Sequence, residues 1–423
     1  MECIMMIRFW KCMVPLLISV TVVLSGCAAA ENNISLLQSP LLANKQHEEL
    51  REVLTKLLPA DVEYLTPKEA QQKQSIFIDD INQDGRQEGF VLYRETGENQ
   101  QVNILVLQKE DGKWNKVQNE ATAYRTLDYF KLEDLDGDGY KEVVVGVGVA
   151  KLAPEKQLLI FEWDNKGLTK KVERNYEALD IADYNEDGIA DILLLEGERD
   201  ISQTAQLFCY VNGQLQSLSS VELDPSAYHE NIVSGRLLDG KKALFIDNGL
   251  GAHSMLTEIV AYDNGKLIKI GDVHDRFLFK AYPVYSKDIN NDGVTEAVGM
   301  YIPNDWGDAA FVEMEFFHVY DNYSIDGTRK TVEERYTNGM KNFYIIIPPE
   351  LYGSVTVEKL DEGVRLLSST DKSVIFEVKW IDKESFDNSK IKLNETKETV
   401  FYTDIKGNTI IPRENFHLFE DDF

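Results

Sequence analysis

The chain has 423 residues, of which 43% are hydrophobic, and it carries 72 Asp and Glu against 44 Lys and Arg, a formal net charge of −28. Its length suffices for one large or two medium domains, and its hydrophobic content is that of a globular protein with a buried core, not of a disordered chain. Because the negative charge repels phosphate backbones, we expect no nucleic-acid partner.

Residues 1–26 have the organisation of a secretory signal peptide. Arg8 and Lys11 precede an apolar run, residues 13–24, that is shorter than the roughly 20 residues a helix needs to cross a bilayer. Residues 24–27 read Leu-Ser-Gly-Cys, which resembles the bacterial lipobox. That resemblance implies a lipid on Cys27 and a lipid-anchored protein on the extracytoplasmic side of a bacterial cell membrane. An ordinary cleaved signal is the alternative.

A spacer and a short helix are predicted next. Residues 27–46 have the composition of a flexible spacer, and residues 47–74 begin with a stripe of leucines and valine at helical spacing that ends before Pro59. We expect this helix to cap the folded body, with docking of a partner as the alternative. Only Cys209 would remain beside Cys27 in the mature chain, so no internal disulfide is expected.

A nine-residue pattern, Asp-x-Asp/Asn-x-Asp-Gly-x-x-Asp/Glu, occurs four times, at residues 80–88, 134–142, 183–191 and 288–296. In residues 134–142 it places carboxylates at positions one, three and five of a tight turn, where they can converge on one hard cation such as calcium. Gly139 gives the backbone freedom that the turn needs, and Glu142 brings a further carboxylate as a β-branched run begins. The carbonyl of Tyr140 is a further candidate ligand.

A worn fifth copy, residues 235–243, keeps the turn glycine but has Gly235, Leu237 and Ala243 at ligand positions. The turn glycines of the five copies recur every 49 to 54 residues, which is typical of stacked supersecondary units. Short apolar segments on both sides of each loop, followed by two further strand-like segments, predict four antiparallel strands per repeat. The predicted fold is therefore mainly β, a β-propeller of about five four-stranded blades.

This loop, seated between the first two strands of a blade, resembles the FG-GAP/VCBS repeat family, which includes the head of integrin α chains and many bacterial surface proteins. The resemblance covers residues 75–335 and implies up to four structural Ca²⁺ ions, with none in the worn copy. It also leaves open that some ions bridge to a bound ligand. The ligands that it implies are Asp80, Asn82, Asp84 and Glu88; Asp134, Asp136, Asp138 and Glu142; Asp183, Asn185, Asp187 and Asp191; and Asp288, Asn290, Asp292 and Glu296.

The repeat stops at about residue 335, because the sequence that follows has no carboxylate loop at the expected distance. We therefore expect residues 336–423 to form a separate small α+β or mostly β domain. The alternative is that they supply one or two degenerate blades of a six- or seven-bladed ring.

Two other places attract attention as candidate sites. Asp247, His253 and Ser254 share one loop, but closeness in sequence is poor evidence for a nucleophilic triad. Trp306 is a candidate aromatic contact for a sugar, peptide or protein, with packing inside a blade as the alternative.

The sequence therefore predicts a non-catalytic binding module for a protein or glycan, displayed at a membrane surface by the lipid on Cys27. A hydrolase or lyase acting on polysaccharide or cell wall is the alternative, since propellers also scaffold enzymes. A purely structural role in a surface complex is a third possibility.

Overall fold

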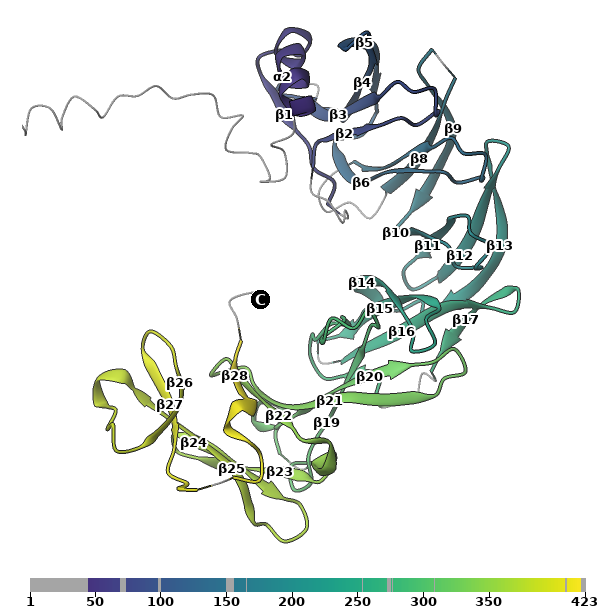
Figure 1. Ribbon diagram of the computed structural model, residues 1–423. Coiled ribbons are helices and arrows are strands. Elements are labelled where there is room, and N and C mark those ends of the chain that lie inside the picture. Colours follow the sequence, from purple (N-terminus) through teal and green to yellow (C-terminus); the bar gives the residue numbers. More distant parts are fainter. Residues whose placement is uncertain are drawn as a thin grey trace, which may run out of the picture. The chain divides into compact units, whose positions relative to one another are not determined.

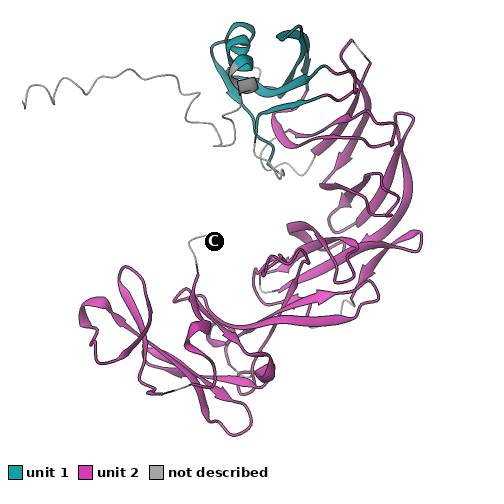
Figure 2. Ribbon diagram, viewed as in Figure 1, with its two compact units in different colours: residues 1–79, 86–122 teal, residues 80–85, 123–423 magenta. Residues whose placement is uncertain are grey.

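The computed structural model describes residues 45–68, 74–97, 100–149, 156–164, 166–252, 254–271, 275, 277–307, 309–407 and 409–419 (Figure 1). The predicted signal peptide, Cys27 and nearly all of the predicted spacer lie outside these residues. The chain divides into two compact units (Figure 2). Unit 1 contains the chain up to Asp79 and Arg86–Thr122, and unit 2 contains Asp80–Gly85 and Ala123–Phe423. No helix in the described ranges has the length and apolar character required to span a membrane.

Unit 1 consists of a helix packed on a small antiparallel sheet. Its elements are α2 (Lys45–Leu57), β1 (Val62–Tyr64), β2 (Ile76–Asp79), β3 (Glu88–Glu95), β4 (Asn103–Glu110) and β5 (Lys113–Ala121). The apolar stripe of α2 turns Leu50 and Leu54 into a core with Val91 and Leu105 of the sheet. Strand β3 pairs with β2 along its first half and with β1 along its second half. The strand β1 was not predicted from the sequence.

Unit 2 begins with three antiparallel sheets of the same design. In each of them four consecutive strands of the chain lie side by side in the order in which they occur in the sequence. Their strands are β6 (Thr126–Glu133), β7 (Glu142–Gly148), β8 (Lys156–Trp163) and β9 (Leu168–Tyr176); β10 (Ala178–Ala182), β11 (Asp191–Glu198), β12 (Ser202–Val211) and β13 (Gln214–Leu223); and β14 (Tyr228–Arg236), β15 (Lys242–Gly251), β16 (Ser254–Asp263) and β17 (Lys266–Ile270). A two-residue strand, β18 (Phe279–Lys280), also pairs with β16.

The sheets of unit 2 pack face to face in sequence order. The sheet of Val144 and Ile160 shares one hydrophobic core with the sheet of Ile192 and Phe208, and similar cores join the later pairs. Inner strands such as β7 are buried at every residue, because both faces of the sheet are covered, whereas the outer strand β9 is mostly exposed. The expected fold class, mainly β with four-stranded propeller-type blades, is confirmed.

The fifth repeat departs from the predicted strands. Its sheet contains β19 (Ala297–Tyr301), β20 (Phe317–Tyr323), β21 (Arg329–Asn338), β22 (Phe343–Ile347) and β28 (Phe416–Leu418). The sequence predicts a strand directly before each loop, but residues 282–285 form none, and an isolated bridge between Lys287 and Glu296 is the pairing found at the last loop. In this stretch the buried Lys280 ammonium donates a hydrogen bond to the carbonyl of Val284 at 2.7 Å.

The expectation of a separate α+β domain at residues 336–423 needs correction. Strand β21 runs across the expected boundary, and β22 and β28 complete the fifth sheet. The remaining strands form a sixth antiparallel sheet: β23 (Val355–Leu360), β24 (Gly363–Ser368), β25 (Val374–Asp382), β26 (Ile391–Glu395) and β27 (Thr399–Thr403). Between these strands, the described residues from 336 onward contain three-residue 3-10 turns and no α-helix.

One core joins the fifth and sixth sheets. Phe343, Ile345 and Ile347 alternate along β22 and turn into a cluster with Val355 and Phe401 of the sixth sheet. Each such side chain contributes about 1.5–3 kcal/mol by its burial. This continuous core favours the alternative in which the C-terminal segment extends the series of blades.

Candidate metal-binding loops

The four complete loops share one backbone conformation. We number the positions of each loop from its first Asp, and we call the loops at residues 80–88, 134–142, 183–191 and 288–296 the first, second, third and last loops. Positions four and six have a positive φ in every loop: 53° and 82° at Gln83 and Gly85, 75° and 89° at Gly137 and Gly139, 63° and 91° at Glu186 and Gly188, and 58° and 86° at Asn291 and Gly293. Glycine at position six adopts this conformation without steric cost.

The same hydrogen bonds aim the side-chain oxygens into each turn. The N–H of the position-six glycine donates to Oδ2 of the position-one aspartate at 2.9 to 3.0 Å in all four loops. The N–H of position five donates to the side-chain oxygen of position three at 2.8 to 3.3 Å. The pattern of residues in the sequence therefore corresponds to one repeated local structure.

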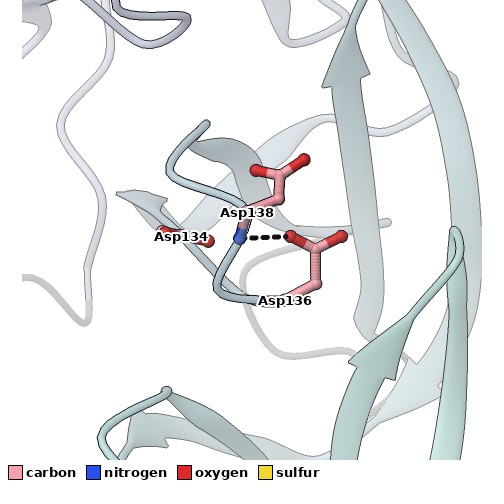
Figure 3. Close-up of side chains that lie close together, drawn as sticks. All are labelled: Asp134, Asp136 and Asp138. Atoms are coloured by element: carbon pink, nitrogen blue, oxygen red, sulfur yellow. Dashed lines mark hydrogen bonds between the residues drawn. The ribbon is translucent and has the colours of Figure 1, made fainter.

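The second loop brings three carboxylates together. Asp134, Asp136 and Asp138 each offer an oxygen, and these three oxygens lie within 4.8 Å of one another. Figure 3 shows the three side chains around the turn, with the backbone nitrogen of Asp138 donating to Asp136. In the other loops an asparagine stands at position three, and its amide oxygen occupies the place of the carboxylate.

Position nine is tied to position two by a backbone hydrogen bond. Leu135 N–H donates to Glu142 Oε2 at 2.9 Å, Tyr184 N–H to Asp191 Oδ2 at 3.0 Å, and Ile289 N–H to Glu296 Oε2 at 2.9 Å. In the first loop, Glu88 is fully buried and accepts a hydrogen bond from Gln108 at 3.0 Å.

Burial disfavours the ionised form of the carboxyl groups at position nine. It raises the pKa of Glu142 to about 8, that of Glu296 to about 7 and that of Asp191 to about 6, and the neighbouring aspartates of each loop add to the rise. Oε1 of Glu296 is buried without a hydrogen-bond partner among the described residues. A bound cation would neutralise the charge and would pair with the open oxygen.

Calcium fits this set of donors. It takes six to eight oxygen ligands from carboxylates, amide oxygens and backbone carbonyls, and each loop offers three side-chain oxygens from positions one, three and five and a carboxylate at position nine. The chemistry that the ion would supply is neutralisation of these charges, which otherwise repel one another.

The worn loop is held by other means. Leu237 at position three is fully buried in the core, and the Arg236 guanidinium donates to the carbonyl of Gly240 at 2.9 Å. The Lys241 ammonium lies 3.2 Å from Glu186 Oε2 of the third loop. A built-in cation thus stands beside this loop, and the expectation that it binds no metal stays a prediction.

The triad considered from the sequence does not fit the surroundings of Asp247. The fully buried Asp247 pairs with the equally buried Lys280, with Oδ1 and Nζ 2.5 Å apart, and accepts hydrogen bonds from Ser286 and Thr257. Burial raises its pKa, but the Lys280 ammonium and these bonds outweigh burial and hold the pKa below its usual range. His253 lies outside the described residues. The sequence reasoning missed Lys280, although a lysine within the apolar run at 277–282 was an available signal.

Trp306 packs within the fold. Its Nε1 donates to the carbonyl of Val357 at 2.9 Å, and its ring lies against the core shared by the fifth and sixth sheets. The Lys359 ammonium lies 4.8 Å from the ring centroid. The packing alternative therefore describes this residue.

No protein-family model and no curated protein matches the chain. Among solved structures, a rhamnogalacturonan lyase of Bacillus licheniformis is 12% identical over 74% of this chain and 71% of its own, with a TM-score of 0.29. A periplasmic gluconolactonase of Pseudomonas aeruginosa is 14% identical, with coverages of 73% and 85% and a TM-score of 0.32. For a putative 6-phosphogluconolactonase of Bacteroides uniformis the values are 11%, 73%, 85% and 0.34. Likeness at this level carries no argument about function.

Proposed function

We propose that the chain is a calcium-stabilised propeller-type binding module of the FG-GAP/VCBS kind, held at the outside of a bacterial membrane by a lipid on Cys27. Its partner would be a protein or a glycan. The calcium ions would fix the connection between the first two strands of a blade, and the partner would bind elsewhere on the module.

The observation that carries the proposal is the repetition of one turn, with one hydrogen-bond pattern, at the four sequence loops that have the calcium spacing. Buried carboxylates such as Glu142, whose pKa burial raises to about 8, are the groups that a divalent cation would stabilise as anions.

Thermal unfolding with and without a chelator tests the calcium part of the proposal. Calcium bound only to the folded chain raises its stability by mass action, so excess chelator is expected to lower the melting temperature. Asp138→Asn removes a charge from position five of the second loop and is expected to reduce the shift. Asp239→Asn, at the same position of the worn loop, is the matched control and should leave the shift unchanged. An equal melting temperature with calcium and with chelator would contradict the proposal.

Fractionation tests the anchor. Cys27→Ser is expected to move the protein from the membrane fraction to the soluble extracytoplasmic fraction, and metabolic labelling with a fatty acid should be lost in the same variant. Retention of the variant in the membrane with unchanged labelling would show that Cys27 is not the lipidated residue.

A further inference from the structure

The calcium-type loops of successive blades touch one another through position four. In the first loop, the side-chain amide of Gln83 donates to the carbonyl of Gly139 in the second loop. A Cβ built on Gly139 would lie only 3.1 Å from that amide nitrogen, so the contact is close. A backbone hydrogen bond runs beside it, from Lys141 N–H to the carbonyl of Ile81, at 2.8 Å.

The same position makes the next two contacts. A Cβ built on Gly137, position four of the second loop, would lie 2.7 Å from Cδ1 of Ile189 in the third loop, so the isoleucine side chain packs on this glycine. Glu186, position four of the third loop, pairs with Lys241 of the worn loop at 3.2 Å. Three consecutive loops thus use position four to contact the following loop.

The compact units of the structure reflect this row of contacts. Residues Asp80–Gly85 belong to unit 2, together with the second loop, whereas the chain up to Asp79 and from Arg86 belongs to unit 1 (Figure 2). The tip of the first loop is therefore part of the same packed body as the second loop.

These contacts reach the groups that would hold the ion. Position four stands between positions three and five, whose oxygens face the turn. In the loop that is contacted, the contacted residue itself binds a candidate ligand. Gly139 N–H donates to Oδ2 of Asp134, and Ile189 N–H donates to Oδ1 of Asp187. Lys141 directly precedes Glu142 in the chain. Ordering one loop around an ion therefore restricts the residues that position the ligands of the neighbouring loop.

We infer that calcium occupancies of the first, second and third loops are positively coupled, so that an ion in one loop raises the affinity of the next. This inference rests on the proposed function. When one loop is already ordered, its neighbour loses less conformational freedom on binding, and the effect is reciprocal between the two sites. The backbone contact continues from the worn loop to the last loop, where Thr295 N–H donates to the carbonyl of Arg236 at 2.9 Å. The worn loop takes up no ion in this proposal and carries the Lys241 ammonium, which is always present, so its order does not change with calcium. The last loop should therefore bind independently of the first three.

Glycine amide signals can follow each loop separately. The position-six glycines Gly85, Gly139, Gly188 and Gly293 lie one in each loop and donate directly to its position-one aspartate. We would titrate the ¹⁵N-glycine-labelled protein with calcium and record the midpoint for each glycine signal, assigning each by the loop variant that abolishes its response. Asp80→Ala inactivates the first loop. It is expected to raise the midpoint at Gly139 about fivefold, a typical coupling between sites, and to leave the midpoint at Gly293 unchanged.

A pair of glycine variants shows whether position four carries the coupling. Gln83→Gly removes the side chain that bonds Gly139 while keeping a residue suited to φ 53°, and Asn291→Gly makes the same change at φ 58° in the last loop. In the Gln83→Gly background, Asp80→Ala should shift the Gly139 midpoint by less than twofold. With Asn291→Gly, the fivefold shift should remain.

The outcomes separate this inference from the proposed function. Calcium responses at all four glycines, with a Gly139 midpoint that Asp80→Ala does not change, overturn the coupling and leave the proposed function standing. A Gly139 shift matched by an equal shift at Gly293 also overturns it, because general destabilisation then explains both. If no glycine signal responds to calcium, the proposed function itself fails and the coupling fails with it.

Discussion

The calcium-free protein is expected to lose stability as the pH rises, and Glu142→Gln should remove part of that loss. Glu142 is only 4% exposed, and burial raises its pKa from 4.5 to about 8. The folded chain therefore holds a proton on this carboxyl between these pH values, whereas the unfolded chain has released it. Because the folded state binds more protons, the free energy of unfolding falls as the pH rises through this window.

The size of the effect follows from the shift. Each pKa unit corresponds to about 1.4 kcal/mol, and allowing for solvent screening near a surface loop we expect a loss on the order of 2 kcal/mol by pH 8.5. Glu296 and Asp191, with pKa values raised to about 7 and 6, act in the same direction. Calcium replaces the proton in each loop, so the loss should be small in its presence. Glutamine keeps the oxygen that accepts the Leu135 N–H but cannot ionise.

Urea unfolding at pH 5 and pH 8.5, in chelator and in calcium, measures these free energies. In chelator at pH 8.5, Glu142→Gln should be about 2 kcal/mol more stable than the parent, whereas in calcium it should be less stable than the parent. Glu198→Gln, at an exposed position on β11, is the control and should change neither value. Glu334 is buried away from the loops, and its pKa is raised to about 7. Its contribution to the loss of stability with rising pH is therefore the same with and without calcium. Burial lowers the pKa of His318 to about 3, so this residue adds stability to both proteins as the pH rises from 5 to about 6.5. The test is therefore the difference between the two proteins: a Glu142→Gln protein that is no more stable than the parent in chelator at pH 8.5 would refute the reasoning.

Two further predictions concern the scaffold. Lys280→Met leaves the buried Asp247 without its cation and is expected to cost about 3–5 kcal/mol in urea unfolding, and the double variant with Asp247→Asn should recover a substantial part; equal costs for the single and double variants would contradict the pairing. Gly146→Ala should lower the melting temperature, because its Cβ would lie 2.2 Å from the hydroxyl of Tyr176, whereas Gly307→Ala, which meets no atom within 4 Å, should leave it unchanged. Equal melting temperatures for the two alanine variants would contradict the close approach.

Local patterns made much of the fold predictable. The strands Ala178–Ala182, Ala297–Tyr301 and Phe343–Ile347 coincide with short, mainly apolar runs in the sequence, because their apolar side chains are buried or half-buried. The acidic loops were predictable for a similar reason, since one short turn requires its glycine and its oxygens at set positions.

Features that depend on distant residues were not predictable in this way. Strand β21 has the polar sequence of residues 329–338, and its place is decided by its neighbours β20 and β22. Because this strand was not predicted, the expected domain boundary fell inside the fifth sheet. Likewise, the buried pair of Lys280 and Asp247 joins residues that are 33 positions apart in the sequence. The contacts between successive loops also join residues about one repeat apart, and no local pattern reveals them.

The calcium content of the purified protein tests the central claim most directly. After equilibrium dialysis against millimolar calcium, elemental analysis is expected to find up to four ions per chain, one for each complete loop, and one fewer in Asp138→Asn than in the parent. The Asp239→Asn protein should contain as much calcium as the parent. A parent protein that retains no calcium under these conditions would contradict the account.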